Sequence, residues 1–136
     1  MGAEAFDTGG VPVEFRRWSL ADEVAEIQKF DVGIMPLPDD EQARGKCGFK
    51  LIAYMACGVP CVASPVGANT HVLANGSTGL LVGETLSWSD ALVALAGDPD
   101  RRRHLSTTGR TWVEANYSLE VMAPKFVSTI IDAAGG

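Results

Sequence analysis

The chain has 136 residues, of which 17 are acidic and 11 are basic, so its formal net charge at pH 7 is −6. Hydrophobic residues make up 46% of the sequence, which is typical of a globular domain and excludes a disordered or fibrous chain. The negative charge argues against a general nucleic-acid binder and against a polybasic membrane anchor, since both are basic.

Residues 1–10 contain glycines and are expected to form a flexible lead-in. Residues 11–136 are expected to form a single domain. Apolar and polar residues alternate over 11–15, which predicts a short strand. Apolar residues at helical spacing then predict a helix that Ser19 caps and that ends near Phe30.

The rest of the chain alternates between short apolar runs and helical patterns. Three further strands are predicted at 31–36, 60–64 and 79–82. A polar loop is expected at 37–46, and a turn at 65–67. Helices are predicted at 46–57, ended by Gly58, and at 68–75, 87–97, 99–115 and 118–133. Ser87 and Ser118 are candidate N-caps, and Pro99 suits a first helical position.

This alternation predicts an α/β fold, in which a Rossmann-like parallel sheet of about four strands has helices on its faces. Ligands bind such sheets at the carboxyl ends of the strands, where the N-termini of helices also point. The loop that follows the 31–36 strand is therefore the first place to look for a site.

The end of that loop and the start of the predicted helix after it carry three cations and two glycines. The residues of this segment are Arg44, Gly45, Lys46, Cys47, Gly48, Phe49 and Lys50. Lysine and arginine beside free backbone amides at the start of a helix suit a diphosphate. A second interpretation is a solvated cluster in which Arg44 pairs with the acids that precede it in the loop. Neither a P-loop pattern nor GxGxxG is present.

Several motifs resemble one family. Residues 44–64, RGKCGFKLIAYMACGVPCVAS, followed by PVGAN, are similar to the donor-site region of retaining glycosyltransferases of the GT-B fold, family four. The motifs FDVGIMPLPDD and NGSTGLLV, and the closing YS before a long helix, occur in the matching order. The resemblance covers nearly everything from residue 11 onward.

The resemblance implies a protein of two Rossmann-like domains, of which this chain corresponds to about the last two-thirds of the second. The partners implied are a nucleotide-sugar or nucleoside diphosphate and an N-terminal acceptor domain that lies outside this chain. Because the first strand–helix units of the donor domain would also lie outside it, the isolated chain is expected to be inactive. No metal ion and no cofactor are expected, because the nucleotide-sugar is a substrate.

Residues 44–50 are the positions that the resemblance assigns to the donor phosphate or sugar, and no catalytic residue can be assigned. Trp18, Gly67 and Asn69 are further candidates for donor contacts, and for Trp18 the alternative is core packing. In many members of the family, a glutamate at the position of Gly45 contacts the sugar hydroxyls and a second at the position of Ala53 contacts the ribose, so the resemblance implies that both carboxylates are missing here. Attack from the front face of the sugar would retain the anomeric configuration without a protein nucleophile.

Three cysteines without paired spacings indicate reduced thiols and a cytoplasmic protein, since disulfide frameworks pair their cysteines. The N-terminus lacks the pattern of a signal peptide. Peripheral membrane association through the acceptor domain is a further expectation.

Two alternative functions stay open. The first is a non-catalytic α/β binding module of receiver or flavodoxin type. The second is a self-associating module that pairs through an exposed sheet edge or through the apolar final helix.

Overall fold

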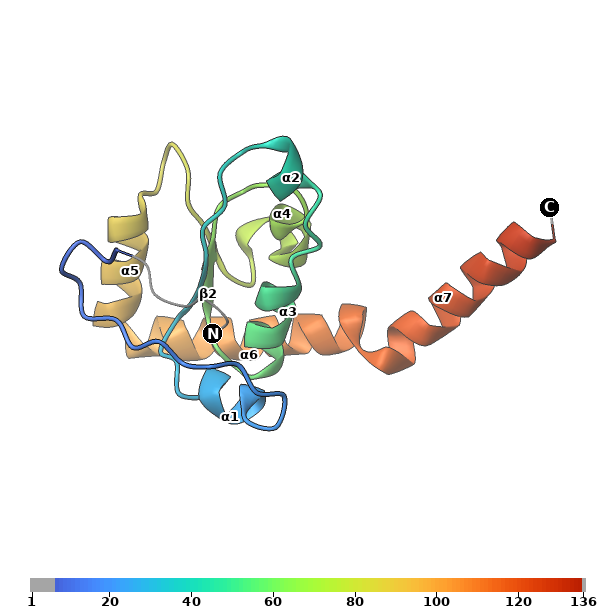
Figure 1. Cartoon of the computed structure of the whole chain (residues 1–136), viewed down its shortest axis with the longest axis horizontal. Helices are drawn as coiled ribbons and strands as arrows, with labels where there is room; N and C mark the ends of the chain where they lie inside the picture. Colours follow the sequence, from blue (N-terminus) through green and yellow to red (C-terminus); the bar gives the residue numbers. More distant parts are fainter. Residues whose placement is uncertain (1–6, 136) are drawn as a thin grey trace.

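The computed structural model describes residues 7–135 and shows a parallel sheet with helices packed around it (Figure 1). The described strands are β1 (Gly33–Met35), β2 (Cys61–Ala63) and β3 (Leu80–Leu81). Their order is β1-β2-β3 and both pairings are parallel, so β2 lies in the centre. Helices connect the successive strands, which confirms the predicted α/β fold.

The described helices follow the predicted order. They are α1 (Glu23–Ile27), α2 (Glu41–Arg44), α3 (Phe49–Ala56), α4 (Asn69–Val72), the 3₁₀ helix η1 (Ala74–Gly76), α5 (Trp88–Gly97), α6 (Pro99–Tyr117) and α7 (Leu119–Ala134). Gly58 has a φ of +73° directly after α3, which confirms the predicted glycine stop. The Ser87 hydroxyl accepts the Asp90 backbone N–H at 3.1 Å, which confirms the predicted cap of α5.

Helices α3 and α5 cover opposite faces of the sheet (Figure 1). Cys61 and Ala63 pack in a core cluster with Leu51 and Met55 of α3. Val62 points to the other face and packs with residues of α5. Because side chains alternate along a strand, the short apolar strand β2 is buried from both sides.

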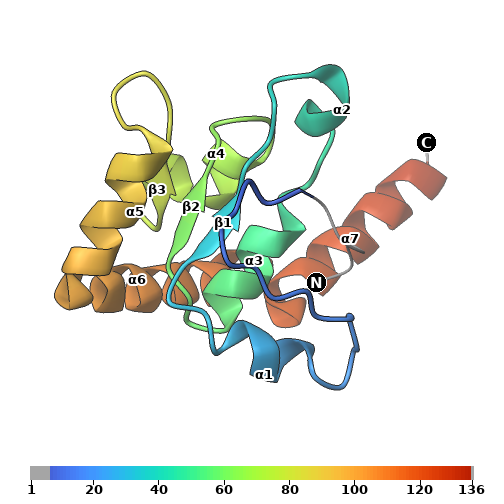
Figure 2. The ribbon, with the colours of Figure 1, turned by 60° about the vertical axis from the view of Figure 1, so that its left-hand side comes forward.

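The predicted strand at 11–15 is wrong, so the described sheet has three strands instead of about four. Pro12 has no N–H to give to a sheet ladder, and Val11 and Val13 stay 62% and 45% exposed. Alternation without burial does not stabilise a strand. Figure 2 shows this N-terminal segment as an irregular trace outside the sheet. Residues 1–6 of the predicted lead-in lie outside the described part of the chain.

Three details of the helix boundaries also differ from the predictions. The polar loop contains the short helix α2, because Asp40 accepts the Ala43 backbone N–H at 2.7 Å and caps it. Helix α1 begins at Glu23 with Asp22 as its first flanking residue, so Ser19 is not its cap. Ser118 precedes α7 as predicted, but its side chain makes no capping hydrogen bond.

Helix α7 projects away from the rest of the described chain (Figures 1 and 2). None of its residues is buried, and Phe126 and Ile131 are 67% and 63% exposed. Strand β1 lies at an edge of the described sheet. Self-association through either surface stays a prediction. Among the described residues, no helix combines the length and the apolar character that crossing a bilayer requires.

The buried thiol of Cys61 is expected to make the fold less stable as the pH becomes alkaline. Burial raises the pKa of Cys61 to about 12, whereas an unfolded cysteine titrates near about 8.5. Between these values the unfolded chain loses the thiol proton and the folded chain keeps it. The Cys61 contribution to stability is therefore complete below about pH 8.5 and is lost as the pH rises toward about 12.

We expect the free energy of unfolding to fall above about pH 8.5, with up to about 1.4 kcal/mol per pH unit from this thiol. Urea denaturation at several pH values measures the decline. Cys61→Ala should flatten it, whereas Cys47→Ala, which removes an exposed thiol, should keep it. Equal declines in all three proteins would contradict the assignment to Cys61.

Candidate functional site

A cavity of about 590 Å³ lies at the carboxyl end of β1. One wall consists of residues 34–37, at the end of β1 and just beyond it. The other wall consists of residues 45–50, which lead into α3. The volume is in the range of cavities that hold small molecules. The structure thus brings together six of the seven predicted loop residues around one cavity.

The start of α3 presents backbone N–H groups that nothing in the described chain accepts. They belong to Cys47, Gly48, Phe49 and Lys50. Gly48 has a φ of +73° and turns the chain into the eight-residue helix. Unsatisfied N–H groups at the start of a helix carry a partial positive charge, so this wall favours an anion.

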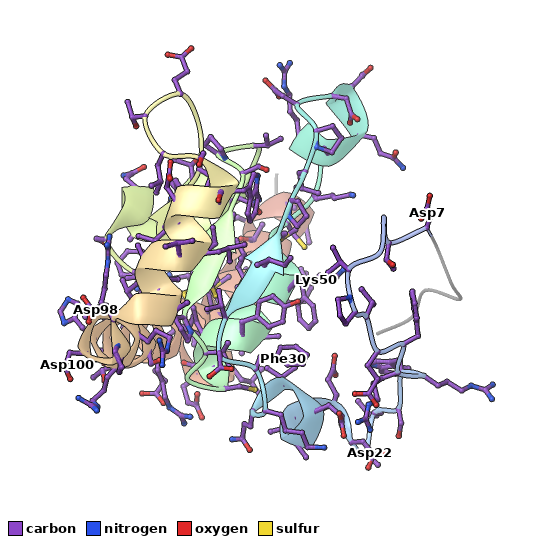
Figure 3. All side chains as sticks on the ribbon, turned by 90° about the vertical axis from the view of Figure 1, so that its left-hand side faces the viewer. Asp7, Asp22, Phe30, Lys50, Asp98 and Asp100 are labelled. Atoms are coloured by element: carbon purple, nitrogen blue, oxygen red, sulfur yellow. The ribbon has the colours of Figure 1, made fainter. Side chains whose placement is uncertain are left out.

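Lys46 and Lys50 add two full positive charges to the same wall. Both side chains are exposed, and neither forms an ion pair with any carboxylate of residues 7–135. Figure 3 shows Lys50 at the start of α3, beside the β1 edge of the sheet. Unpaired ammonium groups can donate charge-assisted hydrogen bonds to phosphate oxygens without first losing a partner.

Arg44 is the predicted loop residue whose side chain the structure places elsewhere. Its Nε donates a hydrogen bond to Asp39 Oδ1 at 2.7 Å, and it does not line the cavity. The hydrogen bond from Arg44 lowers the pKa of the Asp39 carboxyl, with a smaller contribution from its charge. The sequence left open that Arg44 pairs with a preceding acid in a solvated cluster, and the structure shows this pairing for Arg44. Within residues 7–135, neither Lys46 nor Lys50 forms such a pair.

Gly67 and Asn69 lie behind the loop and do not line the cavity. Gly67 has a φ of +55°, and a Cβ on it would lie 2.6 Å from the Arg44 carbonyl oxygen. Asn69 is fully buried, and its Nδ2 donates to the Ser64 carbonyl oxygen at 3.0 Å. Gly67 thus packs against the backbone of Arg44, and Asn69 lies beside Gly48, so both residues contact the loop from the side away from the cavity.

Trp18 lies at a second, smaller cavity of about 190 Å³. Four aromatic side chains line it together with two charged and two aliphatic ones: Trp18, Glu23, Ile27, Phe30, Phe49, Lys50, Ala53 and Tyr54. Phe49 and Lys50 also line the first cavity, so the two cavities share a border. The rings of Phe30 and Tyr54 meet edge to face at a centroid distance of 6.2 Å.

Sequence reasoning missed part of both cavities. The wall at 34–37 could have been found from the rule that ligands bind at strand ends. Phe30 and Tyr54 carried no such signal, because only the packing of the segment after α1 near α3 brings them together. Among residues 7–135, no group of three His, Cys, Asp or Glu side chains could hold a metal ion. That no metal or cofactor is needed stays a prediction.

The family is shown by a match over residues 4–98 to the sequence model described as glycosyl transferases group 1. The match covers well over half of the chain. The chain belongs to this glycosyltransferase family, and its α/β sheet fits a Rossmann-like domain of the GT-B fold, as the resemblance predicted.

Curated relatives carry glycosyltransferase or synthase names. The chain is 29% identical over 113 residues to N-acetyl-alpha-D-glucosaminyl L-malate synthase of Bacillus anthracis, covering 82% of this chain and 29% of the relative. It is 45% identical over 60 residues to a D-inositol 3-phosphate glycosyltransferase of Nocardia farcinica, covering 43% and 13%.

A third relative is the GDP-mannose-dependent monoacylated alpha-(1-6)-phosphatidylinositol monomannoside mannosyltransferase of Corynebacterium glutamicum. The chain is 32% identical to it over 85 residues, which cover 61% of this chain and 22% of the relative. The chain thus spans less than a third of the length of each of these three relatives.

Proposed function

We propose that this chain is the donor-binding part of a retaining glycosyltransferase and that the cavity at 45–50 takes the diphosphate of a nucleotide-sugar. One observation carries the proposal: one cavity at the end of a parallel strand is lined by four residues whose backbone N–H groups have no acceptor within 7–135, and by two lysines that have no ion-pair partner there. Membership of the glycosyltransferase family supports it independently.

The chemistry that these residues can supply is stabilisation of the leaving group. When the bond between the sugar and the diphosphate breaks, negative charge grows on the departing phosphate oxygen. In this proposal, the amides at the start of α3 and the ammonium groups of Lys46 and Lys50, which belong to residues that line the cavity, stabilise that charge. The protein then acts by positioning the donor and by electrostatics, and the acceptor attacks the same face that the diphosphate leaves.

The second cavity suits the base and ribose of the same donor. It borders the first through Phe49 and Lys50, so a ligand can extend from one to the other. Trp18 is 51% exposed and offers a flat apolar surface on which a base can stack. Ala53 leaves the cavity without a carboxylate at the position where the family resemblance places a ribose contact.

An NMR titration of the isotope-labelled chain with UDP and with GDP tests this function. We expect the backbone resonances of 45–50 to shift with saturation, and those of Trp18 to shift with them. Uridine and guanosine, which lack phosphates, serve as controls and should shift 45–50 far less. Absence of any shift at 45–50 with roughly millimolar UDP and GDP would refute the proposed donor site.

A further inference from the structure

The side chain of Asn69 holds a buried hydrogen-bond acceptor that has no partner within residues 7–135. Asn69 is 0% exposed, and its Nδ2 donates to the Ser64 carbonyl oxygen at 3.0 Å. Its Oδ1 has no hydrogen-bond partner among the described residues. Buried amide oxygens are nearly always paired, because an unpaired one has lost its hydration without a replacement.

The loop before α3, which has backbone donors without an acceptor among the described residues, approaches the Asn69 side chain. A Cβ built on Gly48 would lie 3.5 Å from Asn69 Oδ1, so no side chain separates the two residues. The backbone N–H groups of Cys47 and Gly48 have no acceptor in the described chain. An acceptor on Asn69 and the backbone of Gly48 thus lie close together beside the cavity, and within residues 7–135 neither Asn69 Oδ1 nor the Gly48 N–H has a hydrogen-bond partner.

We propose that Asn69 is a positioning residue, whose Oδ1 accepts a backbone N–H from the Cys47–Gly48 segment when a nucleoside diphosphate occupies the cavity. The inference rests on the proposed function and deepens it. One amide of the loop then points back to Asn69, and the amides of Phe49 and Lys50 remain for the phosphate oxygens. Asn69 itself does not touch the ligand.

Ser64 connects Asn69 to the wall of the cavity formed by residues 34–37. Its Oγ accepts the backbone N–H of Leu37 at 3.0 Å, and Leu37 lines the cavity. Its carbonyl oxygen accepts the Asn69 amide. The hydrogen bond to Oδ1 would therefore join the two walls of the cavity through Ser64 and Asn69, and would fix the distance between them.

The two roles explain why an asparagine suits this position. The amide nitrogen must donate to Ser64, and the amide oxygen must accept from the loop, so one side chain needs a donor and an acceptor. Leucine has a similar size and neither function. Aspartate keeps an acceptor but, when ionised, cannot donate to the Ser64 carbonyl and would place a negative charge behind an anion site.

A direct test uses the unmutated chain saturated with UDP and, separately, with GDP. NMR can detect the scalar coupling that a hydrogen bond transmits from a backbone nitrogen to the carbonyl carbon of the acceptor. We expect a coupling between the nitrogen of Cys47 or Gly48 and Cγ of Asn69 in the complex. A complex that forms without this coupling overturns the inference and leaves the proposed donor site intact.

Variants provide the second measurement. Asn69→Leu should weaken UDP or GDP binding by about tenfold, as measured by calorimetry. The matched control is Thr78→Val, which removes another buried oxygen that has no partner in the described part of the chain, lies outside both cavities, and should leave the affinity unchanged. Unchanged affinity in a folded Asn69→Leu also overturns the inference. If neither nucleotide shifts 45–50 in the unmutated chain, the proposed function fails, and this inference fails with it.

Discussion

Replacing Lys46 and Lys50 together by alanine is expected to weaken UDP or GDP binding by about a hundredfold or more. Each lysine can give a charge-assisted hydrogen bond to a phosphate oxygen, worth roughly 1.5–3 kcal/mol. Neither ammonium group has a carboxylate partner within residues 7–135, so its removal breaks no ion pair there. Calorimetric titration of both nucleotides at fixed salt measures the loss.

The chain offers a matched control for this double variant. Lys29 pairs with Glu26 on α1, and Lys125 lies on the exposed helix α7. Replacing these two lysines by alanine changes the net charge by the same amount, and we expect the affinity to fall by less than about threefold. Equal losses in both double variants would mean that overall charge, and not the placement of the lysines, governs binding.

The parts of the fold that were predicted correctly are those whose structure is specified by a few neighbouring residues in the sequence. Buried strand β2 is a short apolar run, and Gly58 ends α3 because a positive φ is needed there. The segment 11–15 has an equally local strand pattern but does not become a strand. Alternating side chains specify a strand only where a neighbouring strand and a core are available to bury one face.

The candidate site also contains a part that neighbouring residues in the sequence predict and a part that depends on tertiary packing. The wall at 45–50 was predicted because its charges, glycines and helix start are adjacent in sequence. Arg44 has the same charge and the same neighbourhood, and only the position of Asp39 decides that it pairs with a carboxylate. The supporting positions of Gly67 and Asn69 depend on the packing of α4 behind the loop, which a pattern of residues does not encode.

Replacing Leu51 by alanine is expected to lower the free energy of unfolding by about 3–5 kcal/mol. Leu51 is on α3, is 0% exposed, and lies in the core cluster with Met35, Met55 and Val113. The truncation leaves a cavity between the sheet, α3 and α6, which neighbours with fixed backbones cannot fill. A domain of this size has only about 5–15 kcal/mol of stability, so a large part is lost.

Urea denaturation measures this loss, and Leu20→Ala provides the matched control. Leu20 is 76% exposed, so the same truncation should change the free energy of unfolding by less than about 0.5 kcal/mol. Because Leu51 fixes the first turn of α3, the folded fraction of Leu51→Ala should also bind UDP or GDP more weakly. A variant as stable as the unmutated chain would mean that α3 does not pack on the sheet as described, and the amides at its start would then lose the support that aims them into the cavity.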